Sequence, residues 1–318
     1  MIFEELNNEQ LETTKCFLAN NIYNHYRYYP SKFKQGWVNF TIDQISHQNK
    51  IREYFFCYDV KKENQLLISI RISKWDEEHF GFKLAMLEFI LFDENVKNGN
   101  LENSFQEIIE FLNKNNIRFI SIRVNGDNLK LIHFLESCGF RYFENVIWPV
   151  GDIRDMHIEE TNDGIRLATS EDLERIKFIA ANFQYQRGHY HCDRRFNINS
   201  VNQLYSKWVE QAFNKGNLII VVEADNIIYG YFIISLDESL SSTLGYKYGR
   251  MCSLAIDSAI RGKGVGKKIF TGTINWMKMR GIEYIDSGYS TKNHLSAKLH
   301  AGHNMYSVYE EITLHLWL

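Results

Sequence analysis

Proline is almost missing from this sequence, with two residues in 318, and its five cysteines are scattered. No two cysteines form a C-x-x-C pair, which excludes a disulfide framework and the common zinc motifs. Lys and Arg (36) nearly balance Asp and Glu (39), so no global basic field points to nucleic acid or to an anionic membrane. No apolar run approaches the roughly 20 residues of a membrane span, and the first residues lack a basic and then apolar leader. We therefore predict a cytoplasmic protein that binds neither a membrane nor nucleic acid.

The composition does provide a folded core, because 45% of the residues are apolar and 14% are aromatic. A length of 318 residues predicts two domains. Pro149, within the turn-like segment 148–151, and the polar run 157–164 mark a boundary between them. The predicted domains are 1–155 and 156–318.

A glycine-studded basic turn stands out in the second domain. Gly262, Gly264 and Gly266 alternate with other residues between an apolar strand, 250–256, and a predicted helix. Glycine allows backbone conformations that are closed to residues with a Cβ, and it lets backbone N–H groups approach an anion. The amides at the start of the helix would point at the same anion. The turn therefore predicts a phosphate-binding loop, with an ordinary glycine-rich turn as the alternative.

Two common phosphate motifs do not fit this turn. A Walker-type loop needs a glycine at the place of Arg261 and a Ser or Thr at the place of Lys268. A dinucleotide fingerprint needs its third glycine at the place of Lys267. The spacing therefore disfavours a nucleotidase, a kinase or a nicotinamide enzyme.

The string R-G-x-G-x-G, preceded by L-A-I-D at 254–257, resembles the GNAT superfamily of acetyl-CoA-dependent N-acetyltransferases. The resemblance implies an α/β fold with a mixed, mostly antiparallel sheet flanked by helices, and acetyl-CoA as cosubstrate. It implies that the loop holds the coenzyme A pyrophosphate, and that the preceding strand holds the pantetheine arm with a backbone N–H near Ile256 facing the oxyanion. The cofactor-binding residues so implied are Leu254, Ala255, Ile256, Arg261, Gly262, Lys263, Gly264, Val265, Gly266, Lys267 and Asn293.

The first half of the sequence repeats the order of elements in the second half. Strand, helix, strand and helix patterns between residues 84 and 138 return after residue 250, and 128–135 is spaced like 293–300. We infer an internal duplication, that is, two GNAT-like domains in tandem. The place of the loop in the first half, 96–100, has one glycine and no arginine. The N-terminal copy is therefore predicted to be degenerate.

Two catalytic candidates follow from the resemblance. His300 occupies the position of the family's proton-donating tyrosine, and an imidazole with an ordinary pKa of about 6.5 can donate a proton near neutral pH. The alternative is a histidine that only stacks on the cofactor or caps the helix end. Asn293 would bind pantetheine or, alternatively, cap the helix that it precedes.

The densest polar and aromatic cluster outside the loop gives the acceptor-binding candidates Arg187, His189, His191 and Asp193. The order F…R…D…LY..W in this region, and a W-D-x-x-x-F-G string at 75–82, resemble the TDP-fucosamine N-acetyltransferase branch of the superfamily. The resemblance implies a nucleotide-linked amino sugar, of the TDP-linked kind, as acceptor. The alternation of His189, His191 and Asp193 also permits a metal site, but the GNAT reaction needs no metal and none is predicted; a solvated loop is the other alternative.

We therefore predict an N-acetyltransferase that acts on the amine of a nucleotide-linked amino-deoxysugar. Acetylation of a peptide or polyamine amine, and an acyl-CoA-binding sensor without turnover, remain as alternatives. The oligomeric state is left open, a homodimer included.

Overall fold

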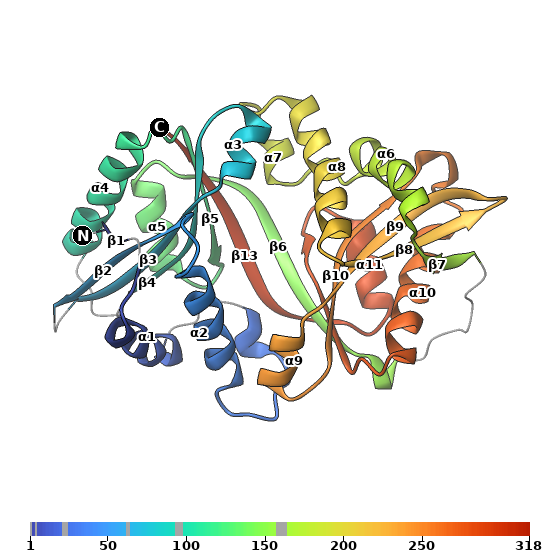
Figure 1. Ribbon diagram of the computed structural model, residues 1–318, viewed down its shortest axis with the longest axis horizontal. Helices are drawn as coiled ribbons and strands as arrows, with labels where there is room; N and C mark the ends of the chain where they lie inside the picture. Colours follow the sequence, from blue (N-terminus) through green and yellow to red (C-terminus); the bar gives the residue numbers. More distant parts are fainter. Residues whose placement is uncertain (1, 4, 21–24, 62–63, 93–97, 157–163) are drawn as a thin grey trace. The chain divides into compact units, whose positions relative to one another are not determined.

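The computed structural model describes residues 2–3, 5–20, 25–61, 64–92, 98–156 and 164–318 (Figure 1). Residues 96–97 in the counterpart of the phosphate loop, 96–100, and residues 157–163 in the predicted boundary run, 157–164, therefore lie outside the described residues. None of the described helices has the length and apolar character needed to cross a bilayer. The chain divides into two compact units, and each is described by itself below.

The first unit is a sheet covered by helices on both faces. The strand order is β1-β2-β3-β4-β5-β13. Its strands are β1 (Ile2–Phe3), β2 (Tyr54–Lys61), β3 (Asn64–Ile72), β4 (Leu84–Phe92), β5 (Phe119–Asn125) and the part of β13 (Tyr306–Trp317) from residue 309 onward. Its helices are α1 (Asn8–Asn20), α2 (Gly36–Gln48), α3 (Lys74–Phe80), α4 (Asn98–Lys114) and α5 (Leu129–Ser137), with a 3-10 turn at His25–Tyr28. Alternate residues of β3 separate the two cores, because Ile68 packs with α4 and α5 whereas Leu67 packs with α1 and α2.

The second unit repeats this plan in the strand order β6-β11-β10-β9-β8-β7. Its strands are β6 (Arg141–Asp152) from residue 146 onward, β7 (Ile165–Leu167), β8 (Leu218–Ala224), β9 (Ile227–Leu236), β10 (Tyr248–Ile256), β11 (Tyr284–Ser287) and β12 (Tyr289–Ser290), which pairs with β6. Its helices are α6 (Leu173–Phe183), α7 (His189–Cys192), α8 (Ile198–Asn214), α9 (Glu238–Leu244), α10 (Val265–Met279) and α11 (His294–Gly302), with 3-10 turns at Ile153–Asp155, Ser170–Asp172 and Ser258–Ile260.

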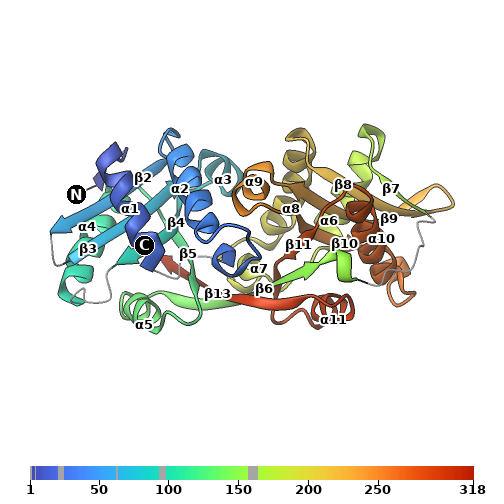
Figure 2. The ribbon, with the colours of Figure 1, turned by 90° about the horizontal axis from the view of Figure 1, so that it is seen from below.

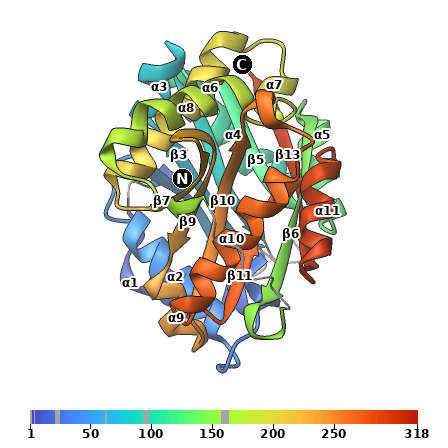
Figure 3. The ribbon, with the colours of Figure 1, turned by 90° about the vertical axis from the view of Figure 1, so that its right-hand side faces the viewer.

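The two opposite faces of β9 and β10 pack against different helices. Phe232 and Met251 pack in the core under α10, whereas Tyr231 and Ala255 pack in the core under α6 and α8 (Figure 3). The pairs β4–β5 and β10–β11 are parallel, and the other ladders of the two units are antiparallel. The predicted α/β fold with a mixed, mostly antiparallel sheet is confirmed.

The two units exchange their last strands. Residues 1–145 form the first unit together with Tyr309–Leu318, and Val146–Val308 forms the second. The C-terminal strand β13, drawn in red in Figure 2, pairs with β5 from Glu311–Asn125 to Trp317–Phe119. The second part of β6 pairs with β11 in the second unit. The division thus falls ten residues before the boundary expected after residue 155, and the end of the chain returns to the first unit.

The duplication is visible in matching helix ends. Asn128 accepts a hydrogen bond from Leu131 N–H at the start of α5, and Asn293, 165 positions later, accepts one from Ser296 N–H at the start of α11. Helices α3 and α9 both end at a glycine with positive φ, Gly81 and Gly245. The W-D-x-x-x-F-G string at 75–82 therefore covers a short capped helix that both copies share.

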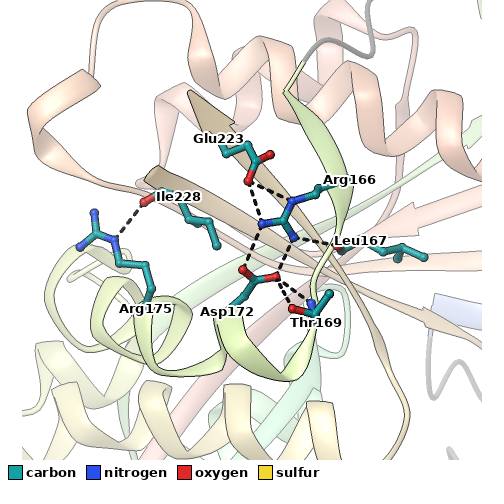
Figure 4. Close-up of polar contacts among 7 residues, drawn as sticks. All are labelled: Arg166, Leu167, Thr169, Asp172, Arg175, Glu223 and Ile228. Carbon is teal, nitrogen blue, oxygen red and sulfur yellow. Dashed lines mark hydrogen bonds and ion pairs between the residues drawn. The ribbon is translucent and has the colours of Figure 1, made fainter. Parts of the chain in front are cut away.

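Arg166 forms hydrogen bonds that link three segments at the beginning of the second unit (Figure 4). Its guanidinium donates to Asp172 at 2.6 and 3.0 Å and to Glu223 at 2.9 Å, which joins β7 to β8 and to the start of α6. Asp172 also accepts from Thr169 N–H at 2.7 Å, so Thr169 caps the start of this helix. The hydrogen bonds from Arg166 lower the pKa of Asp172 to about 2.

Replacing Asp172 by asparagine is expected to lower the free energy of unfolding at pH 7 by about 1–2 kcal/mol, a value that allows for solvent around Arg166. A lowered carboxyl pKa stabilises the fold above the unfolded value, and this contribution is lost as the pH falls from about 4 to about 2. Urea unfolding of the wild type and Asp172→Asn at pH 7 and pH 3 measures the difference, which should shrink at pH 3. Glu174→Gln, at an exposed residue of α6, should change stability by less than about 0.5 kcal/mol; an equal effect of both substitutions would contradict this account.

Candidate active site

The glycine turn between β10 and α10 is an open cradle. Gly262 and Gly264 have φ of +81° and +78°, a region that strains residues with a Cβ. A Cβ built on either of them, or on Gly266, would meet no atom within 4 Å. The glycines are therefore not needed for packing inside the protein. They leave space on one side of the turn, which fits the close approach of an external ligand.

The start of α10 presents amides to this cradle. Gly264 is the N-cap, and it has no side chain with which to satisfy them. The first backbone bond of the helix is donated by Lys268 N–H to Gly264 O, so Val265, Gly266 and Lys267 carry the N–H groups that a helix start leaves unpaired. Lys267 is exposed beside them. This arrangement suits a phosphate group.

The side chain of Arg261 has a different place from the one expected. It donates to Ile256 O at 3.2 Å and to Phe183 O at 3.0 Å, and so fastens the turn to the end of β10 and of α6. Asp257 reinforces this attachment through an ion pair of 2.5 Å with Arg175. Burial alone would raise the pKa of Asp257, but the bonds from Ala259 N–H and Arg175 hold it below its usual value. These contacts preorganise the turn, and any contact of Arg261 with phosphate stays a prediction.

A fork opens in the sheet just before this turn. The parallel ladder between β10 and β11 runs from Tyr248–Tyr284 to Met251–Ser287. Beyond it, β10 continues to Ile256 paired with β9. The two strands therefore separate along 254–256. The edge of β10 that faces the fork carries the backbone groups that an extended ligand could pair with.

A β-bulge lies at the base of the fork. Met251 pairs with Ile234 while Ser253 pairs with Ile233, so Cys252 is an extra residue in β10. A bulge turns one peptide out of the regular ladder and is common next to active sites. The bulge, and not Ile256, is therefore the point at which the backbone of β10 departs from strand geometry.

The first unit has the same fork and bulge. Its parallel ladder also spans four pairs, from Leu84–Phe119 to Leu87–Ile122, and Glu88 is the corresponding bulge residue.

His300 and Asn293 lie on α11. Asn293 Oδ1 accepts from Ser296 N–H at 3.2 Å, so this residue does cap the helix. His300 is 3% exposed, and its Nδ1 is 2.7 Å from Ser296 O. Because a carbonyl only accepts, Nδ1 carries the proton and Nε2 is left as an acceptor. Nε2 is buried and has no hydrogen-bond partner among the described residues.

Burial lowers the pKa of His300 to about 4. A ring that is neutral at pH 7 is a poor proton donor, so the structure does not favour the donor role expected from the sequence. The His300 ring packs against the rings of Phe270 and Tyr289, at centroid distances of 5.1 and 4.7 Å. The residue at the same place in the first copy, Leu135, is also buried.

The lowered pKa predicts an acid-dependent loss of stability. The folded ring stays neutral while the unfolded one takes up a proton below about 6.5, so stability falls as the pH drops from about 6.5 to about 4, by up to about 3 kcal/mol. His300→Phe is expected to remove most of this slope, as measured by urea unfolding at pH 6.5 and 4.5. His294→Gln, at an exposed residue of the same helix, should keep the wild-type slope. Equal slopes in the wild type and His300→Phe would contradict a buried neutral ring.

The acceptor candidates do not converge on one point. Asp193 is 2% exposed and accepts from the Arg195 guanidinium at 2.8 and 2.9 Å, so a role in proton relay is not supported. His191 turns toward α8, where Nε2 lies 3.1 Å from Asn202 Oδ1 and the ring stacks on Tyr205. Burial lowers the pKa of His191.

The remaining two acceptor candidates are less constrained. His189 packs its ring against Tyr190, and Arg187 is exposed. No three His, Cys, Asp or Glu side chains in the described part of the chain are grouped to hold a metal ion. Of the predicted cluster, Arg187 and His189 remain candidates for contact with an acceptor.

A polar connection that the sequence did not reveal brings this segment to β10. Gln184, at the end of α6, donates to Ser253 Oγ at 3.2 Å and accepts from Tyr231 OH at 3.0 Å. Gln184 comes three residues before Arg187, so the acceptor segment starts on the α6 face of β10 beside the bulge. The signal was weak in sequence, because one glutamine and one serine are unremarkable residues.

Part of this chain is similar in sequence to a known protein family, and its fold is similar to that of solved structures. Residues 180–304 match the model of the acetyltransferase (GNAT) family. No curated protein matches the chain in sequence. Among solved structures, a GCN5-related N-acetyltransferase from Sphaerobacter thermophilus is similar at a TM-score of 0.58 and 11% identity, over 86% of this chain and 84% of that one.

Two further structures share the fold over most of this chain. A tandem GNAT protein from the clavulanic acid biosynthesis pathway has a TM-score of 0.54 and 10% identity, with 83% and 82% of the two chains covered. A GCN5-related glucosamine N-acetyltransferase region of a fungal multi-domain enzyme has a TM-score of 0.61 and 12% identity, over 99% of this chain and 38% of that one. Residues 180–304 thus match the GNAT family model, and the chain shares its fold with these three structures.

Proposed function

We propose that the second unit acetylates the amine of an amino sugar, carried in nucleotide-linked form. The observation that carries this proposal is the placement of cradle and fork on one strand, β10. The cradle at 262–266 would hold the pyrophosphate of acetyl-CoA. Four residues of strand then lead from Ile256 back to the bulge at Cys252, a span of about 13 Å along which the pantetheine arm would lie.

The reaction then needs an amine nitrogen beside the bulge. The nitrogen forms a bond to the thioester carbon, the carbon–sulfur bond breaks, one proton leaves the nitrogen and the sulfur takes up a proton. We assign oxyanion stabilisation to backbone N–H groups at the bulge, near Cys252 and Ser253, in place of Ile256. Asn293 fixes the start of α11, and His300 Nε2 serves as a hydrogen-bond acceptor toward the pantetheine arm.

The choice of an amino sugar rests on the acceptor side. Exposed Arg187 and Arg194 flank α7 and supply cations that a nucleotide diphosphate would pair with. The resemblance of this segment to the TDP-fucosamine N-acetyltransferase branch points to the same class. An acidic groove that would attract a polyamine is not supported here, because Asp193 is neutralised by Arg195.

The test is release of free coenzyme A thiol from acetyl-CoA with a panel of amines. The panel contains TDP-amino sugars, glucosamine, a peptide with a free N-terminus and spermidine, with a reaction lacking amine as control. Release with the amino sugars supports the proposal. Release with only the peptide or spermidine would overturn the acceptor class, and binding of acetyl-CoA without release for any amine would favour a sensor.

A further inference from the structure

An ion pair with a buried carboxylate lies on the α6 face of the sheet at the base of the fork. Arg250 and Asp286 are register partners in the β10–β11 ladder. Their neighbours Met251 and Ile285 pack under α10, so the ion pair faces the opposite side, toward α6. Asp286 is 2% exposed and is bound by the Arg250 guanidinium, with Nε at 2.9 Å from Oδ2. Two charges inside a sheet are expensive to bury for structure alone.

Trp148 completes this cluster from strand β6. The Arg250 guanidinium lies 5.0 Å from the centre of its ring. A Cβ on Gly288 would come within 3.3 Å of ring atoms Cη2 and Cζ2, so the indole packs on the first residue after the β10–β11 ladder ends. Trp148 is half-buried. The ring therefore packs between Arg250 and Gly288 at the base of the fork, and part of its surface is exposed to solvent.

The first unit provides an internal reference for this place. The pairing of Val150 with Asp286 in the second unit matches that of His315 with Ser121 in the first. The residues that correspond to Trp148, Arg250 and Asp286 in the other copy are Thr313, Met86 and Ser121, which are 165, 164 and 165 positions away in the sequence. The fold thus forms without the tryptophan, the arginine or the aspartate. The three occur together in the unit that has the phosphate cradle, on the side of β10 from which Gln184 and the acceptor segment approach.

We propose that Trp148, Arg250 and Asp286 form an acceptor platform that selects a sugar ring. The apolar face of the sugar would lie on the open surface of Trp148, and the ion pair would orient its hydroxyl groups while the amine points toward the bulge at Cys252. This inference rests on the proposed function and deepens it. Trp148 lies in β6, which follows the first copy in the sequence but pairs with β11 of the second unit. The proposed platform therefore depends on the strand exchange.

The test compares an amino sugar with a short linear amine as acceptors for the full chain. Trp148→Ala is expected to raise KM for the amino sugar about tenfold, with kcat within about twofold, because an aromatic face no longer packs against the ring. KM for ethanolamine and the Kd for acetyl-CoA should stay at wild-type values. Trp148→Phe should restore most of the affinity for the sugar. Trp75→Ala, at a partly buried tryptophan of the first unit, is the matched control and should change neither KM.

The outcomes separate the platform from the proposed function. An unchanged KM for the amino sugar in Trp148→Ala, with turnover retained, would overturn the platform and leave the acetyltransferase assignment intact. An equal loss with both amines, or weaker acetyl-CoA binding, would show that Trp148 only maintains the fold and would also overturn it. No binding and no turnover of amino sugars by the wild type would overturn both, whereas failure of Trp148→Phe to recover the sugar KM would refute ring packing.

Discussion

Gly264→Val is expected to raise the Kd for acetyl-CoA at least about 100-fold, which corresponds to about 2.7 kcal/mol. Gly264 has φ of +78° and caps α10, and the space beside it is open. A β-branched side chain would strain the turn and would fill the space that the pyrophosphate needs. Isothermal titration with acetyl-CoA measures the change.

The matched control is Gly216→Val. Gly216 has φ of +77° and a Cβ on it would also meet no atom within 4 Å, but it lies in the turn between α8 and β8. Both substitutions should therefore lower the melting temperature to a similar extent through backbone strain. Only Gly264→Val should lose acetyl-CoA. Wild-type affinity in Gly264→Val, or an equal loss in Gly216→Val, would mean that the cradle is not the binding site.

Removal of residues 309–318 is expected to unfold the first unit. These residues form the strand that pairs with β5 over seven register pairs, and Leu314 is 1% exposed in the core under α4 and α5. Loss of the strand would expose that core and the edge of β5, a cost comparable to the whole stability of a domain, about 5–15 kcal/mol. Limited proteolysis of the truncated chain should cleave within 1–145.

Removal of Leu318 alone is the control, since it lies beyond β13 and is exposed. It should leave the proteolysis pattern and the melting temperature close to those of the full chain. A truncated chain that resists protease like the full one would show that the first unit does not require the exchanged strand.

The sequence was informative where local chemistry decides the structure. The patterns between residues 84 and 138 predicted the order strand, helix, strand, helix, and the glycines at 262–266 predicted the turn and the helix after it. Asn128 and Asn293 were correctly aligned because a cap depends on residues three positions apart.

Other features depend on contacts that a pattern does not contain. The pattern of residues 306–317 identifies a strand but not its partner, so the exchange with β6 was missed and the boundary was expected near residue 155. Asp193 looked available for chemistry until its ion pair with Arg195 was known. The pKa of His300 depends on burial beside Phe270, which composition does not reveal.

The exchange of β6 and β13 also sets an order of events during synthesis. A ribosome makes the N-terminal copy first, yet the sheet of that copy needs residues 309–317, which emerge after all of the catalytic unit. Until residues 309–317 have been made, the edge of β5 lacks the strand that covers it in the folded protein. Folding of the first unit is thereby linked to synthesis of the whole second unit.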